Sequence, residues 1–235
     1  MTKFAAVLRG ASALVMLSGL AFAQDATAIL KSVGETYSAL KSYEFQGATS
    51  AVTQTGKLSS TSEETFTVVF SAPDQFFVEL RYPGQGSWTR ASDGKTFTEA
   101  RTVTKEYSQR PTTQYDIRVL DNSPIGGFYT MDTGNKTVSV EGSETLTVDG
   151  QSIDCWVIQT DRDMGMLPDG VKRLPTKLWV DKARFLVLRQ ISGTESAATG
   201  SKAAKNTRTM NITHLQTGQT IAPEVFVPAR TTKKK

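Results

Sequence analysis

Residues 177–191 read KLWVDKARFLVLRQI, two strand-like segments joined at the central Asp-Lys pair. A strand with one side in water alternates apolar and polar residues, and this stretch does not. In the first segment Leu178 and Val180 point to one side and Trp179 to the other. In the second segment the opposed pairs are Phe185 with Val187 and Leu186 with Leu188. One apolar face can pack on the core, and the opposite face needs a second cover.

The preceding sequence predicts one helix followed by an antiparallel sheet. Apolar residues recur at helical spacing from Ile29 to Leu40, after Asp25, which can cap the helix. The remainder reads as nine or ten strands joined mainly by tight turns, with Asp-Gly pairs at 93–94 and 149–150 marking two hairpins. Such a sheet is antiparallel and meandering, and at this size it tends to curl, close or split.

The N-terminus has the three parts of a secretory signal peptide. Lys3 and Arg9 flank the start of an apolar run that is too short to span a bilayer, and Ala21-Phe22-Ala23 forms a small-residue cleavage site. We therefore expect residues 1–23 to be removed after export; the alternative is an N-terminal core helix. The expected organisation is a single domain over 24–230 and a basic tail at 231–235. No cysteine follows the leader to carry a lipid anchor, so the mature chain is expected to be soluble.

Composition and motifs argue against several classes of function. The chain has 235 residues and a net charge of +4, which falls to +2 when Lys3 and Arg9 leave with the signal peptide. The body is nearly neutral, which disfavours nucleic-acid binding. The single histidine, His214, and the single cysteine, Cys155, lie in strand-like runs without the partners of a catalytic triad, a thiol nucleophile or a metal centre. We expect no catalytic residue, no metal and no cofactor.

Two segments interrupt the strands and are unusually apolar for connections. TTQYDIRVLDNSPIGGFYTMD (112–132) predicts a short helix with a flexible exit, and DRDMGMLPDG (161–170) is a methionine-rich loop. A curled sheet with apolar flaps at its rim could enclose a pocket for a hydrophobic small molecule, to which methionine side chains adapt in shape. The alternative is that each apolar stripe is ordinary core.

Five stretches together resemble the LolA/LolB family of bacterial lipoprotein carriers and related periplasmic proteins. The opening helix and first strand, AILKSVGETYSALKSYEFQG, are followed by FSAPDQFFVEL, the SDGKTFTEA hairpin, KLWVDKARFLVLRQ and a C-terminal EVFVPA strand. The resemblance implies an α+β fold, in which an N-terminal helix and short lid helices or loops cover a strongly curved, incomplete antiparallel barrel of about 9–11 strands. The concave face of that fold holds acyl chains.

The resemblance also implies a role and a set of site residues. The role is a soluble, monomeric periplasmic carrier that takes lipoprotein acyl chains or another lipid from an inner-membrane exporter toward an outer-membrane acceptor. In the family an Arg before the strand-initiating Pro holds the lid closed, and here that position is Ala72. The predicted cavity residues are Phe66, Val68, Phe70, Phe76, Val78, Leu80, Trp88, Leu178, Val180, Leu186 and Leu188. The predicted lid or mouth residues are Ile117, Leu120, Phe128, Met164, Met166 and Leu167.

Two other classes of function remain open at this point. Related folds occur in envelope-stress regulators, where a ligand-sensing or interaction module passes a signal to a partner without transporting lipoproteins. An enzyme is the second alternative, and the chain lacks an evident pairing of nucleophile and base for it.

Overall fold

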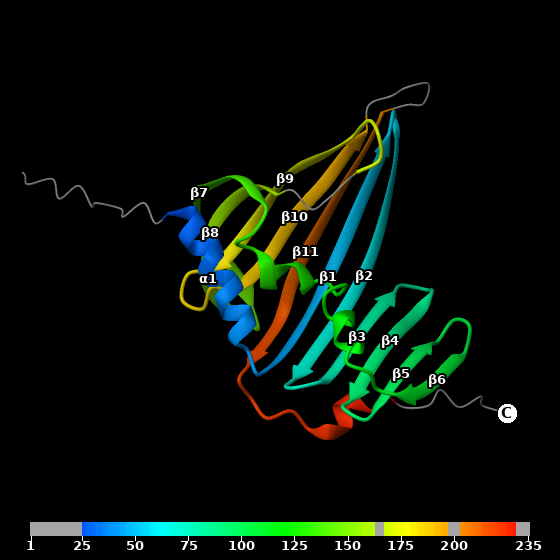
Figure 1. Ribbon diagram of the computed structural model, residues 1–235. Helices are drawn as coiled ribbons and strands as arrows, with labels where there is room; N and C mark the ends of the chain where they lie inside the picture. The colour runs from blue at the N-terminus through cyan, green and yellow to red at the C-terminus, as the bar shows by residue number, and fades with distance from the viewer. Residues whose placement is uncertain (1–24, 163–166, 197–202, 229–235) are drawn as a thin grey trace, which may run out of the picture.

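The computed structural model describes residues 25–162, 167–196 and 203–228 (Figure 1). It consists of one α-helix and an 11-stranded sheet in the order β6-β5-β4-β3-β2-β1-β11-β10-β9-β8-β7, with every neighbouring pair antiparallel. Strands β6 and β7 are its two free edges, so the curved sheet does not close. The predicted fold, one helix with an incomplete antiparallel barrel, is confirmed.

The strands are long in the middle of the sheet and short at one wing. The first half comprises β1 (Ser42–Thr55), β2 (Leu58–Ser71), β3 (Gln75–Tyr82), β4 (Gly86–Asp93), β5 (Thr96–Arg101) and β6 (Glu106–Pro111). The second half comprises β7 (Asn135–Val148), β8 (Gln151–Arg162), β9 (Val171–Asp181), β10 (Val187–Ser196) and β11 (Ala204–Thr217). Three 3-10 helices complete the order: η1 (Asp116–Val119), η2 (Gly126–Thr130) and η3 (Pro223–Phe226).

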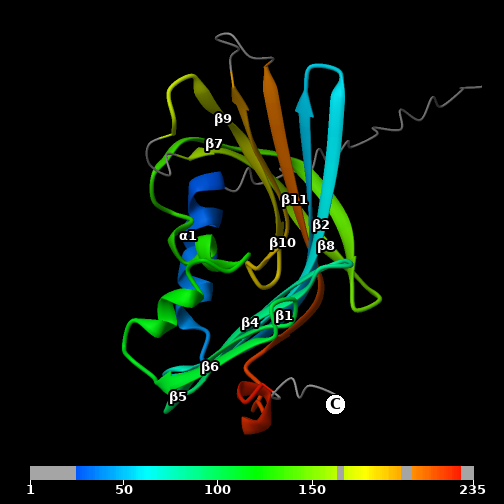
Figure 2. The same ribbon diagram turned by 90° about the vertical axis from the view of Figure 1, so that its right-hand side faces the viewer.

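Helix α1 (Ala26–Ala39) lies in the concavity of the sheet (Figure 2). The Asp25 carboxylate accepts a hydrogen bond from the Thr27 N–H at 2.9 Å and so caps the first turn. The apolar side of the helix carries Ile29 and Val33, which are fully buried. Below it, antiparallel register places Phe45 of β1, Val68 of β2 and Val78 of β3 in one row across the concave face. This helix-on-sheet contact forms the centre of the core.

The protein itself covers both apolar faces of the β9–β10 hairpin. Leu178 and Val180 are fully buried in the main core cluster, on the side of β9 opposite Trp179. The Trp179 indole N–H donates to the Glu144 carboxylate of β7 at 2.8 Å, and the Arg189 guanidinium lies 5.2 Å from its ring centroid. Trp179 is therefore only 5% exposed.

The turn of this hairpin is longer than the sequence pattern predicted. The sequence pattern predicts Phe185 in the second strand, whereas the residue has a φ of 56° and belongs to the turn, and β10 begins only at Val187. The Asp181 carboxylate organises the turn by accepting the backbone N–H groups of Ala183 and Arg184 at 2.8 and 3.2 Å. The Phe185 ring instead packs at a tilt against Trp156, with ring centroids 5.5 Å apart.

The described residues 224–228 of the C-terminal stretch EVFVPA do not form the expected strand. Pro223 begins η3, since its fixed φ suits a helix start and it lacks the N–H that a strand ladder needs. Phe226 is 1% exposed, and η3 contacts β3 and β4. The segment therefore covers part of the sheet with the apolar side chain of Phe226.

Some expected features lie beyond the described part of the chain. The predicted signal peptide (1–23) and basic tail (231–235) are outside it. Within residues 25–162, 167–196 and 203–228, no helix combines the length and apolar character needed to cross a membrane.

Gly47 provides a test of the sheet packing at the centre of the concave face. A Cβ at this position would lie 2.2 Å from the Asn211 carbonyl oxygen and 2.5 Å from Cζ of Phe66. Gly47→Val should lower the free energy of unfolding by about 3 kcal/mol, because neither the backbone nor the ring can move freely. Urea unfolding measures the change, with Ser50→Ala on the same strand as the control. Equal stability of the two variants would contradict the close approach.

Candidate functional site

Most of the predicted cavity residues lie in the closed core beneath α1. Three of them are only partly buried, namely Phe70, Leu80 and Trp88. The other eight are exposed by 6% or less and share one cluster: Phe66, Val68, Phe76, Val78, Leu178, Val180, Leu186 and Leu188. The open parts of the concave face are therefore found around the three partly buried residues.

A small cleft separates the sheet from the segment 112–131, which contains η1 and η2 and which we call the lid. The cleft has a volume of about 280 Å³. It brings the cavity residue Phe70 together with the lid residues Ile117 and Leu120. Its other lining residues are Tyr37, Ser38, Leu40, Lys41, Ala72, Asp121 and Tyr129. We call this space the apolar cleft, because hydrocarbon and aromatic carbon dominate its walls.

The remaining lid predictions have different outcomes. Phe128 of η2 is 1% exposed and packs against Tyr37, with ring centroids 5.3 Å apart. Leu167 is partly buried in the connection from β8 to β9 and does not line the apolar cleft. Met164 and Met166 lie outside the described residues.

An ion pair fastens the first part of the lid to the edge of the sheet. Arg110 of β6 donates two hydrogen bonds to the Asp116 carboxylate, at 2.8 and 2.5 Å, and the Thr113 N–H donates to it at 2.7 Å. The hydrogen bonds from Arg110 lower the pKa of Asp116 from 3.8 to about 2, so this carboxylate is charged at neutral pH. Arg110 thus joins the start of the lid to edge strand β6.

A pair of tyrosines fastens the second part of the lid to β1. The hydroxyl oxygens of Tyr43 and Tyr129 lie 2.5 Å apart in a hydrogen bond. Burial, with the neighbouring tyrosine as a smaller cause, raises the pKa of Tyr43, and burial likewise raises the pKa of Tyr129. Both groups are therefore neutral and can act as donor and acceptor. The lid is joined to the sheet by polar contacts beside the cleft, where sequence reasoning named only apolar residues.

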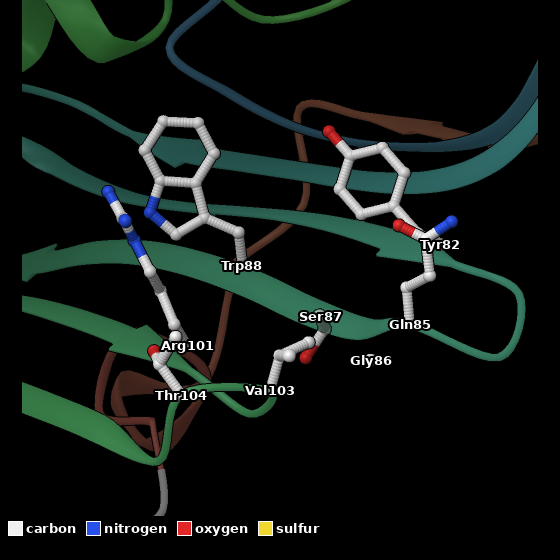
Figure 3. Close-up of a pocket in the computed structure, with 8 residues that line it drawn as sticks. All are labelled: Tyr82, Gln85, Gly86, Ser87, Trp88, Arg101, Val103 and Thr104. Carbon is white, nitrogen blue, oxygen red and sulfur yellow. The ribbon is translucent and has the colours of Figure 1, made fainter.

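Trp88 lies at a different opening, at the turn end of the β3–β5 wing (Figure 3). This pocket has a volume of about 340 Å³ and is lined by Tyr82, Gln85, Gly86, Ser87, Trp88, Arg101, Val103 and Thr104. Arg90 and Arg101 lie 3.9 and 5.3 Å from the Trp88 ring centroid, and the indole N–H donates to Glu99 at 2.9 Å. The Trp88 ring is thus occupied by intramolecular contacts and does not join the apolar cleft.

A third hollow lies on the concave face beyond the apolar rows. It has a volume of about 390 Å³ and is lined by Thr49, Ala51, Ser62, Glu63, Glu64, Leu80, Tyr82, Asn122 and Arg208. Seven of its nine lining residues carry polar groups, and we call it the polar hollow. Asn122 lines the polar hollow, while its neighbours Leu120 and Asp121 line the apolar cleft. The two spaces therefore flank one short segment of the lid.

The groups most often used in catalysis have structural roles here. His214 has a partner that sequence reasoning missed, since its Nδ1 lies 2.7 Å from Oδ1 of Asp149, 65 residues away. Asp149 also accepts the Leu215 N–H, so this pair ties the turn of the β7–β8 hairpin to β11. Burial raises the pKa of the Cys155 thiol to about 11, which keeps it protonated at neutral pH.

The comparisons with known proteins concern the fold. No protein-family model matches the sequence, and a search of curated proteins finds no match. Solved structures that it resembles include lipoprotein LppX of Mycobacterium tuberculosis, with 13% identity over 83% of this chain and 96% of that chain, at a TM-score of 0.44. A LolA superfamily protein of Nitrosomonas europaea has 12% identity over 86% and 97% of the two chains, at a TM-score of 0.34.

The Pseudomonas aeruginosa MucA/MucB complex is a further similar structure. Its matched chain has 15% identity to this one at a TM-score of 0.42, over 87% of this chain and 61% of that chain. A LolA superfamily protein is thus one of the solved structures that this chain resembles.

The ion pair at the lid predicts an acid-sensitive contribution to stability. The pKa of Asp116 is lower in the folded protein than in the unfolded chain, so the contribution is present above pH 3.8 and is lost as the pH falls toward 2. Asp116→Asn should lower the free energy of unfolding at pH 7 by about 1–2 kcal/mol. It should also make the free energy of unfolding fall less steeply between about pH 5 and 2, because the Asn side chain takes up no proton in this range.

Urea unfolding at several pH values measures both effects. Asp169→Asn, at an exposed carboxylate in the β8–β9 connection, serves as the control and should follow the wild type. An Asp116→Asn variant with the wild-type pH profile would show that Arg110 and Asp116 do not secure the lid.

Proposed function

We propose that this chain is a binding protein that shields an acyl chain, of a lipoprotein or another lipid, in the apolar cleft beneath the lid. The observation that supports the proposal is the apolar cleft between the lid and the sheet. Phe70, Ile117 and Leu120 present hydrocarbon to an open cleft there, while the lid is held beside it by polar contacts. An exposed acyl chain is unfavourable in water by about 0.8 kcal/mol per CH₂, so transit through water requires such a cover.

The size of the cleft implies that the lid moves when a lipid binds. Its volume of about 280 Å³ lies just under the usual ~300–1,000 Å³ of small-molecule sites. A whole acyl chain therefore needs space that the lid now fills, for example around Leu120 and Phe128. Displacing the lid breaks the hydrogen bonds of Asp116 and Tyr129 and the ring contacts of Tyr37 with the lid, whereas the packing of α1 on the sheet is kept.

The wider role that we propose follows the resemblance of the sequence motifs. The chain would act as a monomer, as one domain over 24–230 and in the periplasm, after loss of the leader. It would receive its cargo from an inner-membrane exporter and pass it toward an outer-membrane acceptor. Transfer between partners needs binding and release but no covalent chemistry, which suits a chain whose His214 and Cys155 serve structural contacts.

A sensing or interaction module is the second candidate, and the edge strand β7 favours it. Its seven consecutive positions 139–145 are exposed, and β7 is a free edge of the sheet. Free edges can accept a strand from a partner protein. A partner that binds this edge while the apolar cleft takes up no lipid would favour this second function.

Ile117→Glu tests the acyl-chain proposal directly. A carboxylate in the lid wall should weaken binding of a fluorescent fatty acid by about tenfold or more, because binding would then bury a charge against hydrocarbon. The measurement is a fluorescence titration of the detergent-free protein. Leu58→Glu, at a 72% exposed leucine far from the cleft, is the matched control and should bind like the wild type. Equal affinity of both variants, with unchanged unfolding, would contradict the proposed site.

A further inference from the structure

The concave face changes from apolar to polar at one row of paired residues. Register places Gly47 of β1 beside Phe66 and Ile212, and the next inward-facing row contains Thr49, paired with Glu64 and Met210. The row beyond pairs Ala51 with Ser62 and Arg208. The polar hollow begins at this boundary. An amphipathic molecule lying along the strands would therefore meet apolar and polar walls in succession.

Charged and hydroxyl groups converge in the polar hollow. The Arg208 guanidinium donates to Oε1 of Glu64 at 2.8 Å, and the Glu64 side chain is only 16% exposed. The Tyr82 hydroxyl also forms a hydrogen bond with the Glu64 carboxylate. Burial, and to a smaller extent this carboxylate, raises the pKa of Tyr82. Tyr82 is thus protonated at neutral pH. The hollow presents donors and acceptors together around a neutralised ion pair.

Thr49 supplies an independent sign that the hollow accommodates a ligand. It is 3% exposed and lines the hollow, and its Oγ1 has no hydrogen-bond partner among the described residues. Buried hydroxyls in folded proteins nearly always have a partner. Its Oγ1 is shielded from solvent in this structure, so a ligand hydroxyl seated in the hollow would supply a partner once the Thr49 side chain turns toward it. The volume of about 390 Å³ is within the usual ~300–1,000 Å³ range of small-molecule sites.

We propose that the polar hollow binds a neutral polyhydroxylated headgroup, such as a sugar, of a lipid whose chain runs beneath the lid. This inference rests on the proposed function for the position of the chain. Glu63 and Glu64 disfavour an anionic headgroup, and Arg208 disfavours a cationic one. Hydroxyl groups both donate and accept, so they match the mixture of Thr49, Tyr82, Asn122 and the ion pair. Leu80 and the Tyr82 ring offer apolar contact for the carbon face of a sugar.

Three probes separate the headgroup from the chain. Octyl β-D-glucoside, kept below its micelle concentration, carries both; 1-octanol carries only the chain, and methyl β-D-glucoside only the sugar. Calorimetric titration of the full protein should give an affinity for octyl glucoside about tenfold above that for octanol, since two or more hydrogen bonds distinguish them.

Thr49→Val is the decisive variant, because it removes the hydroxyl and keeps the shape. It should weaken octyl glucoside binding by about fivefold, leave octanol binding unchanged and leave stability equal or higher, since a buried polar group without a partner is lost. Tyr82→Phe should likewise reduce only glucoside binding. Thr65→Val, at an exposed residue on the opposite face of β2, is the matched control.

Each outcome decides between the two proposals. Equal binding of octanol and octyl glucoside by the wild type would overturn the headgroup site and leave the acyl cleft standing. Binding of methyl glucoside without octanol would support the hollow and overturn the acyl cleft. A glucoside preference that survives Thr49→Val and Tyr82→Phe would overturn the assignment to the hollow. Failure of all three probes to bind would overturn both proposals.

Discussion

The packing of Tyr37 is the contact on which the rest of the architecture depends. Its ring centroid lies 5.9 Å from that of Phe45 in the sheet, 5.3 Å from that of Phe128 and 5.8 Å from that of Tyr129 in the lid. Its hydroxyl accepts the Val187 N–H of β10 at 3.3 Å. One buried side chain of α1 therefore joins the central strands, the far half of the sheet and the lid. These contacts hold the helix in place on the sheet, and the lid packs on the outer side of Tyr37.

This arrangement explains why we propose binding in the apolar cleft between lid and sheet and not over the whole concave face. The concave rows beneath α1 are already covered by the helix, so their apolar residues stabilise the fold. Beyond Phe66 the face turns polar, with Thr49 and Glu64 in the next row. On the concave face, the margin of the lid leaves apolar surface of Phe70, Ile117 and Leu120 beside a cleft. A guest held there would have hydrocarbon on one side of segment 120–122 and hydrogen-bonding groups on the other.

The sequence predicted the elements well because their signals are local. Helical spacing after Asp25 and the Asp-Gly turns at 93–94 and 149–150 predicted α1 and two hairpins. The double-sided apolar pattern of residues 177–191 correctly required two covers, but it could not say that Glu144 and Arg189 help to provide one of them. Likewise, no local pattern distinguished the 3-10 helix η3 from a strand, since the burial of Phe226 depends on strands that are distant in the sequence.

The polar part of the site was missed for the same physical reason. Arg110 and Asp116, Tyr43 and Tyr129, and Glu64 and Arg208 meet only when strands and lid are assembled, and the last two pairs are 86 and 144 residues apart in the chain. Apolar stripes reveal which faces are buried, whereas they do not reveal whether a helix or a ligand covers them. Phe66 and Phe70 carry the same signal on one strand, yet the first is core and the second lines the apolar cleft.

Native mass spectrometry of the protein, purified without detergent and followed by organic extraction, tests the central claim most directly. The account predicts a bound lipid or acylated peptide in the wild type, and its loss in a folded Ile117→Glu variant. A wild-type protein that carries no such molecule, and that takes up none when mixed with lipid vesicles, would contradict it. The apolar cleft would then be a packing imperfection at the lid, and partner binding at the β7 edge would become the better account.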